Sequence, residues 1–265
     1  MLTTIIDFYN HYDEDSRLDR DNYHRTEFLV TLKLLEPYLA PGSRILDAGA
    51  GTGRYSCYYA ELGHSVVGLD LTPRHVESIR NKAAQPHLED RLSAVLGDAR
   101  DLSMFQDESF DAVFCMGPLY HLKDDASRTA CMDECLRVLK KGGLLAVAYV
   151  NRAGAYLYEI TRNPAVLTKQ PPAHVFSSEG GLNNGCFVTL SPQEIEQFMA
   201  QFPIILKEHA ATDGVSAIMN QVVNKMSAEQ FEAWLEFMFL TNRKLDNLGT
   251  SLHNLYIAQK KNDNR

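Results

Sequence analysis

The stretch Arg44–Ser56, RILDAGAGTGRYS, decides the fold of this chain. A short apolar run ends at Asp47, glycines follow at positions 49, 51 and 53, and a run with helical character comes next. Glycine permits positive φ and lets a ligand approach the backbone closely. A helix that begins near Gly53 directs free amide groups at the same place, which favours an anionic ligand group. The stretch therefore predicts a buried strand, a ligand-binding turn and a helix.

Strand-like and helix-like segments alternate from this stretch to Val150. Apolar runs at 65–70, 92–98, 110–116 and 144–150 are separated by helical patterns, among them 72–84 and 128–143. The second of these helices is expected to end at its Lys-Lys-Gly-Gly sequence, because cations and glycine are typical of helix C-termini. Such alternation requires crossover connections, so it predicts a parallel sheet with helices on both faces.

The regular alternation of strand-like and helix-like segments ends after Val150. Residues 151–190 have no clean period and are expected to form a long excursion with turns. Helices are predicted at 191–202, where Ser191 and Glu194 form a capping box, and at 227–240. Strands are predicted at 204–210 and 253–261. We therefore expect lid helices over 1–40 and a main domain over 41–265, with insertions at about 151–190 and 215–248.

Composition excludes several classes of protein. The 34 acidic and 26 basic residues give a net charge of -8, which argues against a nucleic-acid partner. No apolar run approaches the roughly 20 residues of a membrane span, and a signal peptide is not expected at the beginning. Five cysteines without a C-x-x-C pair suit reduced thiols, so we expect a cytoplasmic protein that does not bind membranes.

The second predicted strand ends at Asp70, 21 positions after Gly49 (70 minus 49). In open parallel sheets ligands bind beyond the carboxyl ends of the strands, and an acid at this spacing binds ribose hydroxyls. A ligand that carries a ribose is therefore predicted. A tight turn without a ligand is the alternative, and Asp70 and Asp98 are then cap or loop residues.

Five segments occur in order: ILDAGAGTGRYS, VVGLD, VLGDARDL, SFDAVFCMGPLYHL and VLKKGGLLAVAYV. Together they resemble the class I S-adenosylmethionine-dependent methyltransferases, in the small-molecule branch called type 11. The resemblance covers roughly residues 40–150. It implies a Rossmann-like, doubly wound α/β fold, whose seven-stranded, mostly parallel sheet has its last strand antiparallel. It also implies S-adenosyl-L-methionine as cofactor and in-line methyl transfer to a small-molecule acceptor, for which no metal is needed.

The resemblance assigns residues to parts of the cofactor. The turn is expected to hold the methionine moiety, Asp70 the ribose diol, and Asp98 with Ala99 the adenine. Leu71 is expected to pack on the adenine, and Asp47 to orient the loop or offset the positive charge. An N-terminal lid is expected to bring tyrosines, including Tyr9, and an arginine towards the cofactor carboxylate or the substrate. The cofactor-binding residues predicted are Tyr12, Arg17, Asp47, Gly49, Ala50, Gly51, Gly53, Asp70, Leu71, Asp98, Ala99 and Met116.

His121 is the candidate general base, because it follows the fourth strand beside the expected methyl position. A ring that only fixes the loop is the alternative, and Tyr120 carries the same ambiguity. Residues expected near the acceptor are Tyr23, Tyr120, Arg152 and His253. Two other functions stay open. A nicotinamide-dependent oxidoreductase is disfavoured because the glycines are spaced G-x-G-x-G, not G-x-G-x-x-G. A non-catalytic module that binds an adenosyl ligand would keep the same site.

Overall fold

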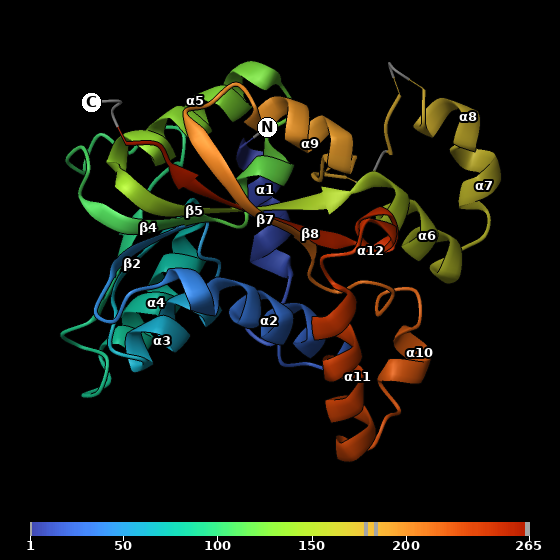
Figure 1. Ribbon diagram of the computed structural model, residues 1–265, viewed down its shortest axis with the longest axis horizontal. Coiled ribbons are helices and arrows are strands. Elements are labelled where there is room, and N and C mark those ends of the chain that lie inside the picture. The colour runs from blue at the N-terminus through green and yellow to red at the C-terminus, as the bar shows by residue number, and fades with distance from the viewer. Residues whose placement is uncertain (1, 178–179, 183–184, 263–265) are drawn as a thin grey trace.

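A mixed β-sheet of eight strands runs through the middle of the molecule (Figure 1). The computed structural model describes residues 2–177, 180–182 and 185–262. Seven strands follow the order β3-β2-β1-β4-β5-β8-β7 across the sheet. Their bounds are β1 Arg44–Ala48, β2 Ser65–Asp70, β3 Leu92–Leu96, β4 Phe110–Cys115, β5 Leu139–Asn151, β7 Ile204–Ala211 and β8 His253–Lys260.

The direction of the strands confirms the predicted doubly wound fold. Strands β1 to β5 pair in parallel, and β8 runs antiparallel to both β5 and β7. The sheet has eight strands, one more than expected, because the two-residue strand β6 (Thr189–Leu190) pairs in parallel with the end of β5. The chain returns to the sheet at β6 after the excursion that follows Asn151. Because β6 has only two residues, no periodic pattern in the sequence marks it.

The glycine turn lies where the order of the strands reverses. Strand β1 has β2 on one side and β4 on the other. The carboxyl ends of these strands therefore meet at the switch point, where ligands bind in such sheets. Both faces are covered, which explains the near-continuous apolar strands.

Helices form one layer on each face of the sheet (Figure 1). One face carries α2 (Asn22–Leu35), α3 (Arg54–Glu61) and α4 (Pro73–Ala83), and the other carries α5 (Asp125–Val138) and α9 (Pro192–Met199). Each layer has its own apolar core. Ile45, Phe114 and Ile257 are buried towards α2 and α3, whereas Leu46, Val113 and Leu145 are buried towards α5 and α9.

The predicted boundary between α5 and β5 is wrong. The helix ends at Val138, and the Lys-Lys-Gly-Gly sequence belongs to β5. Leu139 already pairs with Phe110, and the register shifts before Ala112 pairs with Leu144. Gly142, at φ +73°, allows the irregular strand at this point. Pairing with β4 thus ends the helix before its glycines.

The excursions are more helical than the sequence indicates. Residues 152–175 contain α6 (Arg152–Arg162), α7 (Val166–Lys169) and α8 (Pro172–Val175), which turns alone do not describe. The capping box of α9 is confirmed, since the Ser191 and Glu194 side chains each bond the other residue's backbone. Residues 220–250 hold α10 (Asn220–Val223), α11 (Ala228–Thr241) and α12 (Leu245–Thr250), and two short 3-10 helices cover Glu36–Tyr38 and Pro118–His121.

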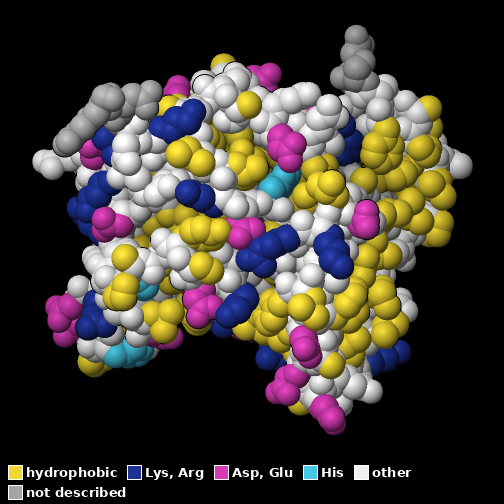
Figure 2. Space-filling view, viewed as in Figure 1, with side chains coloured by type: hydrophobic (Ala, Val, Ile, Leu, Met, Phe, Trp, Pro, Cys, Tyr) yellow, Lys and Arg dark blue, Asp and Glu magenta, His cyan; other side chains and the backbone are white. Residues whose placement is uncertain are grey.

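The peripheral helices expose apolar side chains. Figure 2 shows hydrophobic atoms over α6 to α8 and along α11, on the side away from the central sheet. Leu240 is 71% exposed and Leu245 is 80% exposed. Among the described residues, no helix has both the length and the apolar character that a bilayer crossing requires. The N-terminal helix α1 (Leu2–His11) crosses the carboxyl edge of the sheet.

Candidate active site

The glycine turn after β1 has the positive φ angles that its glycines permit. Gly49, Gly51 and Gly53 all have positive φ, at 82°, 55° and 89°. A Cβ on Gly49 would lie 2.5 Å from Pro118 Cδ, so this position also accommodates the loop after β4. The Gly49 amide donates to the Leu69 carbonyl at 2.7 Å, which ties the turn to β2. The result is a cradle of exposed backbone that a side chain would fill.

Asp70 joins this cradle from the end of β2. Its carboxylate accepts the amide of Gly51 at 2.8 Å and the amide of Thr72 at 2.8 Å. The His75 Nδ1 atom lies 3.1 Å from the same carboxylate. Each carboxylate oxygen can accept a further bond. Asp70 therefore fixes the loop and retains acceptor capacity towards a cavity. This cavity is lined by residues 47, 49–52, 54–55, 69–72, 75, 97–99, 116–118 and 120–122, together with parts of the N-terminal segment. We call this the first cavity.

Asp47 lies beneath the turn and is 2% exposed. Its carboxylate accepts the Ser56 hydroxyl at 2.6 Å. Burial, and to a lesser degree the neighbouring charge of Asp70, raises the pKa of Asp47 to about 6. Two carboxylates at one loop suit a cationic ligand, because its charge offsets their repulsion.

The predicted adenine residues also line the first cavity. Leu71, Asp98 and Ala99 are all part of its wall. The Asp98 carboxylate is held by Arg100, whose Nη2 lies 2.6 Å from it. Burial acts to raise the pKa of Asp98, but the hydrogen bonds from Arg100 outweigh it and lower the pKa. Asp98 is thus already paired with a cation, whereas the described hydrogen-bond partners of Asp70 include no Lys or Arg side chain.

The N-terminal segment closes over the cavity through several ion pairs. Arg54 binds Asp19 through two hydrogen bonds, at 2.6 and 3.0 Å, and Lys82 pairs with Asp15. Arg17 lies inside this cover and binds Glu14 at 2.9 Å. Both Arg17 and Glu14 line the first cavity.

Tyr12 lies elsewhere than its predicted role suggests. It stacks on Phe8, with ring centroids 5.3 Å apart, and lines a second cavity beside the first. The second cavity is bounded by α1, α2, α6, the start of β8 and Phe187. Both cavities are lined by Tyr9, Glu14, Arg17, Tyr55, Met116 and Tyr120. They are therefore neighbouring compartments, with the loop after β4 as part of their common wall.

His121 is buried in the wall of the first cavity and both of its ring nitrogens have partners. Nε2 lies 2.9 Å from the Tyr9 hydroxyl and Nδ1 lies 3.2 Å from the Cys186 carbonyl. Burial lowers the pKa of His121. The ring is therefore neutral and fixes the loop in this arrangement, and its role as a base stays a prediction.

The residues predicted near the acceptor are divided by the structure. Tyr23, Tyr120 and His253 all line the second cavity, and the Tyr120 hydroxyl donates to the Met116 carbonyl at 2.9 Å. Arg152 lies in a different hollow, where its Nη2 binds both carboxylate oxygens of Glu194 at 2.8 Å. The charge of Arg152 is therefore neutralised by Glu194, which also belongs to the capping box of α9.

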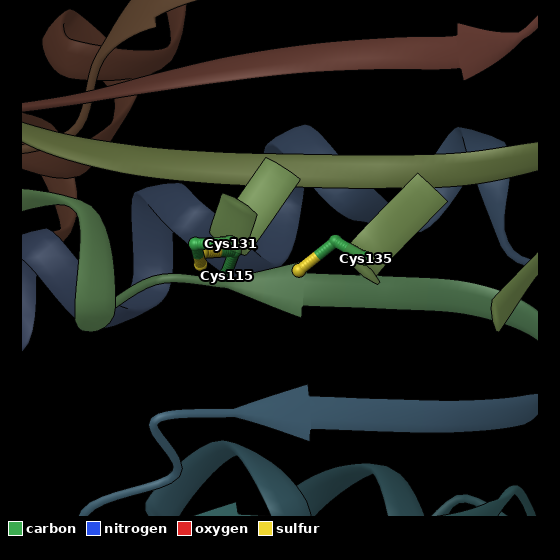
Figure 3. A group of neighbouring side chains, drawn as sticks. All are labelled: Cys115, Cys131 and Cys135. Atoms are coloured by element: carbon green, nitrogen blue, oxygen red, sulfur yellow. The ribbon is translucent and has the colours of Figure 1, made fainter. Parts of the chain in front are cut away.

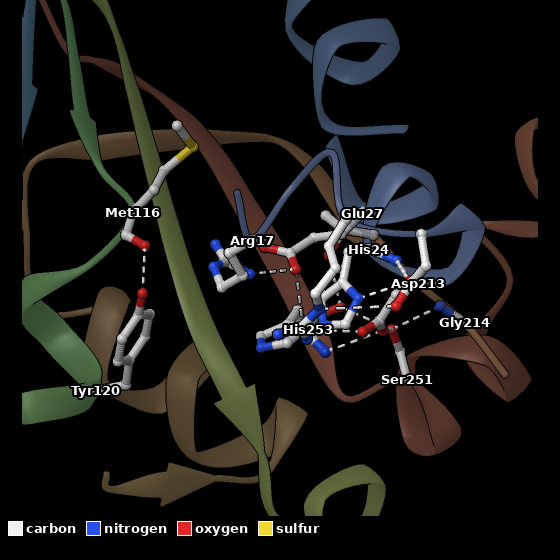
Figure 4. Close-up of polar contacts among 12 residues, drawn as sticks. Arg17, His24, Glu27, Met116, Tyr120, Asp213, Gly214, Ser251 and His253 are labelled. Atoms are coloured by element: carbon white, nitrogen blue, oxygen red, sulfur yellow. Dashed lines mark hydrogen bonds and ion pairs between the residues drawn. The ribbon is translucent and has the colours of Figure 1, made fainter. Parts of the chain in front are cut away.

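A buried charged cluster at the second cavity joins the predicted residues Arg17 and His253 to Glu27, which was not predicted (Figure 4). Glu27 accepts Arg17 Nη1 at 2.8 Å, and His253 lies next to both Glu27 and Asp213. Burial acts to raise the pKa of Glu27, but Arg17 and then His253 lower it to about 2. Glu27 and Asp213 are isolated acids in the sequence, more than 180 positions apart, so no local pattern marks the cluster.

Three cysteines gather between β4 and α5 (Figure 3). The sulfur atoms of Cys115, Cys131 and Cys135 all lie within 4.8 Å of one another, and each residue is fully buried. Hydrogen bonds among the thiols, which act in opposite directions, and then burial leave each pKa well above its usual value. The thiols are therefore neutral and pack in the apolar core that covers this face of the sheet.

Comparison with known proteins agrees with this geometry. Residues 46–147 match the family described as a methyltransferase domain. Over 114 residues the chain is 37% identical to the ubiquinone biosynthesis O-methyltransferase of Xanthomonas oryzae pv. oryzae (strain PXO99A), an alignment that covers 43% of this chain and 46% of that protein. The chain thus spans about half the length of the curated relatives it matches.

Solved structures show the same fold at low identity. A SAM-dependent methyltransferase of Thermotoga maritima superimposes with a TM-score of 0.60 at 20% identity, covering 98% of this chain and 100% of that one. The Burkholderia thailandensis 1,6-didemethyltoxoflavin-N1-methyltransferase gives 0.59 at 15% identity, covering 98% and 88%. Residues 46–147 are therefore similar to a methyltransferase domain, and the chain has the fold of these solved methyltransferases.

Proposed function

We propose that the chain binds S-adenosylmethionine in the first cavity and transfers its methyl group to a small molecule in the second. One observation carries this proposal: the glycine cradle and Asp70 form a cavity that adjoins a separate aromatic cavity at Met116 and Tyr120. Methyl transfer needs this arrangement, because donor and acceptor must meet in line while each has its own site.

The residues of the first cavity fit the cofactor. The absence of a side chain at Gly49 and Gly51 lets Pro118 and Glu14 pack against the turn, so that backbone forms the cavity wall there, and the Asp70 carboxylate can accept ribose hydroxyls. Asp47 and Asp70 offset positive charge, and the planar fork of Arg17 can bind the cofactor carboxylate when this carboxylate replaces Glu14 or Glu27, which Arg17 binds in this structure. When bound, the cofactor supplies an activated methyl group on a sulfonium. The relative from Xanthomonas oryzae is named an O-methyltransferase, and the Burkholderia structure holds S-adenosylhomocysteine, which supports the same cofactor here.

The protein's own contribution is positional. The N-terminal segment lies over both cavities, and we propose that it acts as a lid that excludes water and orders the acceptor. Holding two reactants in a near-attack geometry contributes up to about 7–11 kcal/mol in favourable cases. All five cysteines are free thiols, which supports the proposed cytoplasmic location.

Calorimetry tests the proposal. We expect the wild-type chain to bind S-adenosylmethionine and S-adenosylhomocysteine, and not NAD. Incubation with a panel of hydroxylated and amino metabolites should then release S-adenosylhomocysteine. Binding of NAD alone would overturn the proposal in favour of an oxidoreductase. Cofactor binding without turnover of any panel member would favour a non-catalytic binding module.

A further inference from the structure

Asp213 and His253 form a hydrogen-bonded pair at the edge of the second cavity. Asp213 follows β7 and is fully buried, and His253 is the first residue of β8. The Asp213 carboxylate lies 2.8 Å from His253 Nδ1 and also accepts the His253 amide at 3.0 Å and the Ser251 hydroxyl at 2.6 Å. The carboxylate is therefore rigidly held, and it fixes the imidazole in turn.

The charges around His253 determine which nitrogen carries the proton. Nδ1 faces two carboxylates, since Glu27 Oε2 lies 3.5 Å away in addition to Asp213. Carboxylates accept hydrogen bonds, so Nδ1 is the protonated nitrogen in the neutral ring. Within the described residues, Nε2 has no hydrogen bond, and the side chain retains 23% exposure where it lines the second cavity. The unshared pair of Nε2 is thus available to a ligand.

Arg17, from the segment before α2, also acts on His253, and Tyr23 and His24, from α2, line the same cavity. Burial acts to lower the pKa of His253, but Glu27 and then Asp213 outweigh it and raise the pKa, while Arg17 opposes them. The phenol of Tyr23 stays neutral, because burial raises its pKa. His253 is therefore a stronger base than an exposed histidine, and this strength comes from two carboxylates on different elements.

His121 differs from His253 in this respect. Both of its nitrogens are bonded, and it adjoins the first cavity, where the cofactor is proposed to bind. In Figure 4, Met116 and Tyr120 lie on one side of Arg17. His253 lies on the other side, together with Glu27 and Asp213. Met116, Tyr120 and His253 all line the second cavity, so an acceptor bound there lies in the same cavity as the loop after β4 and the imidazole.

The wall of the second cavity indicates the class of acceptor. Aromatic rings from α1, α6 and the segment before β6 line it, among them Phe8, Tyr12, Tyr158 and Phe187. Charged side chains also line this cavity, and they pair with one another: Arg17 with Glu14 and Glu27, and Arg162 with Glu159. Such a site favours a flat, uncharged ring, which packs against aromatic side chains without leaving a charge unpaired.

We propose that Asp213 and His253 act as a base dyad for a hydroxyl group on an aromatic acceptor; this inference rests on the proposed function. His253 Nε2 takes the hydroxyl proton. The acceptor oxygen forms a bond to the methyl carbon, the carbon–sulfur bond breaks, and its electron pair neutralises the sulfonium to a thioether. The proton on His253 then passes to solvent, and Asp213 stabilises the imidazolium until it leaves.

The full chain is tested with catechol as the probe acceptor. Aniline, which carries an amino group in place of the hydroxyl groups, is tested in parallel. We expect methylation of catechol whose kcat/KM rises with pH, with a limb above 6.5 because only unprotonated His253 accepts the proton. The H253Q variant should lose the limb and about 10²–10⁴-fold in kcat. The D213N variant should move the limb to lower pH, because a carboxylate that raises the pKa is gone. Exposed His87, changed by H87Q, is the control and should leave the profile unchanged.

Two further measurements separate this inference from the proposed function. Calorimetry with S-adenosylhomocysteine should give the same affinity for wild type, H253Q and D213N, which also shows that the variants fold. Histidine NMR titration should place the pKa of His253 above 6.5 in wild type and lower in D213N. Unaltered cofactor binding without methylation of catechol, or an unchanged pH limb in H253Q, would overturn the dyad alone. Failure of the wild-type chain to bind S-adenosylhomocysteine would overturn the proposed function and the dyad with it.

Discussion

The two cavities of the molecule are assembled from different kinds of sequence. The first is made mainly by residues that directly follow β1, β2, β3 and β4, so its key groups lie next to a strand end in the chain. The second brings together α1, α2, α6 and β8, with Glu27 and His253 more than 220 positions apart. The position of a cofactor site can therefore be predicted from short motifs, whereas that of an acceptor site depends on how distant elements pack.

The largest expected effect breaks the first cavity at its backbone. Gly49→Val places a side chain at φ +82°, with its Cβ 2.5 Å from Pro118. Backbone strain costs about 1–3 kcal/mol and overpacking a similar amount, so urea unfolding should show a loss of about 2–6 kcal/mol. Gly249→Ala is the control, because Gly249 has no heavy atom within 4 Å of its built Cβ and no positive φ. An unchanged urea midpoint for Gly49→Val would contradict the strained cradle.

The next effect tests the second cavity through its buried ion pair. The pKa of Glu27 is about 2, below its ordinary value of 4.5, so its contribution to stability is complete above pH 4.5 and is lost as the pH falls towards 2. A shift of this size corresponds to about 3 kcal/mol, which Glu27→Gln should remove at pH 7.

Urea unfolding of wild type and Glu27→Gln should therefore differ most at neutral pH and converge near pH 2. The control is Glu36→Gln, since Glu36 pairs with Lys33 on the surface and is 66% exposed. Such pairs contribute at most about 1 kcal/mol. A difference for Glu27→Gln that does not depend on pH would mean that packing, not charge, holds this part of the cavity.

A third prediction compares two carboxylates of the first cavity, those of Asp70 and Asp98. Asp70→Asn should weaken S-adenosylhomocysteine binding by roughly 10- to 100-fold, since a charge-assisted hydrogen bond contributes about 1.5–3 kcal/mol. Asp98→Asn should cost less, because Arg100 already occupies that carboxylate. Calorimetry of both variants gives the order directly. Equal losses would show that Asp98 faces the ligand as Asp70 does.

The smallest effect is expected at the periphery. Leu240→Lys changes a side chain on α11 that is 71% exposed, so unfolding free energy should change by less than about 0.5 kcal/mol. The matched buried change on the same helix, Met238→Ala, should cost about 2–5 kcal/mol, because Met238 is fully buried. A large loss for Leu240→Lys would mean that this face of α11 is covered.

Local sequence rules predicted the ends of an element correctly where the residues that cap or start it belong to the same short segment. Ser191 and Glu194 predicted the start of α9, and Gly53 predicted the start of α3. They failed where strand pairing competes with a local signal. The Lys-Lys-Gly-Gly sequence indicates a helix end, yet β4 draws Leu139 into pairing before the glycines are reached. The contact of Arg152 with Glu194 also lies beyond local rules, because the two residues are 42 positions apart in the chain.

Local sequence signals gave the order of the strands and helices in residues 44–150, the glycine turn and the acid that follows it, because each of these signals acts within a few residues. Packing of distant elements brought Glu27 and His253 to one cavity with Asp213 buried beside His253, turned Tyr12 towards the same cavity, and placed Arg17 in the wall of both cavities. The physical reason is that burial and charge pairing depend on which elements meet across the carboxyl edge of the sheet. No residue carries that information in its own neighbourhood of the chain.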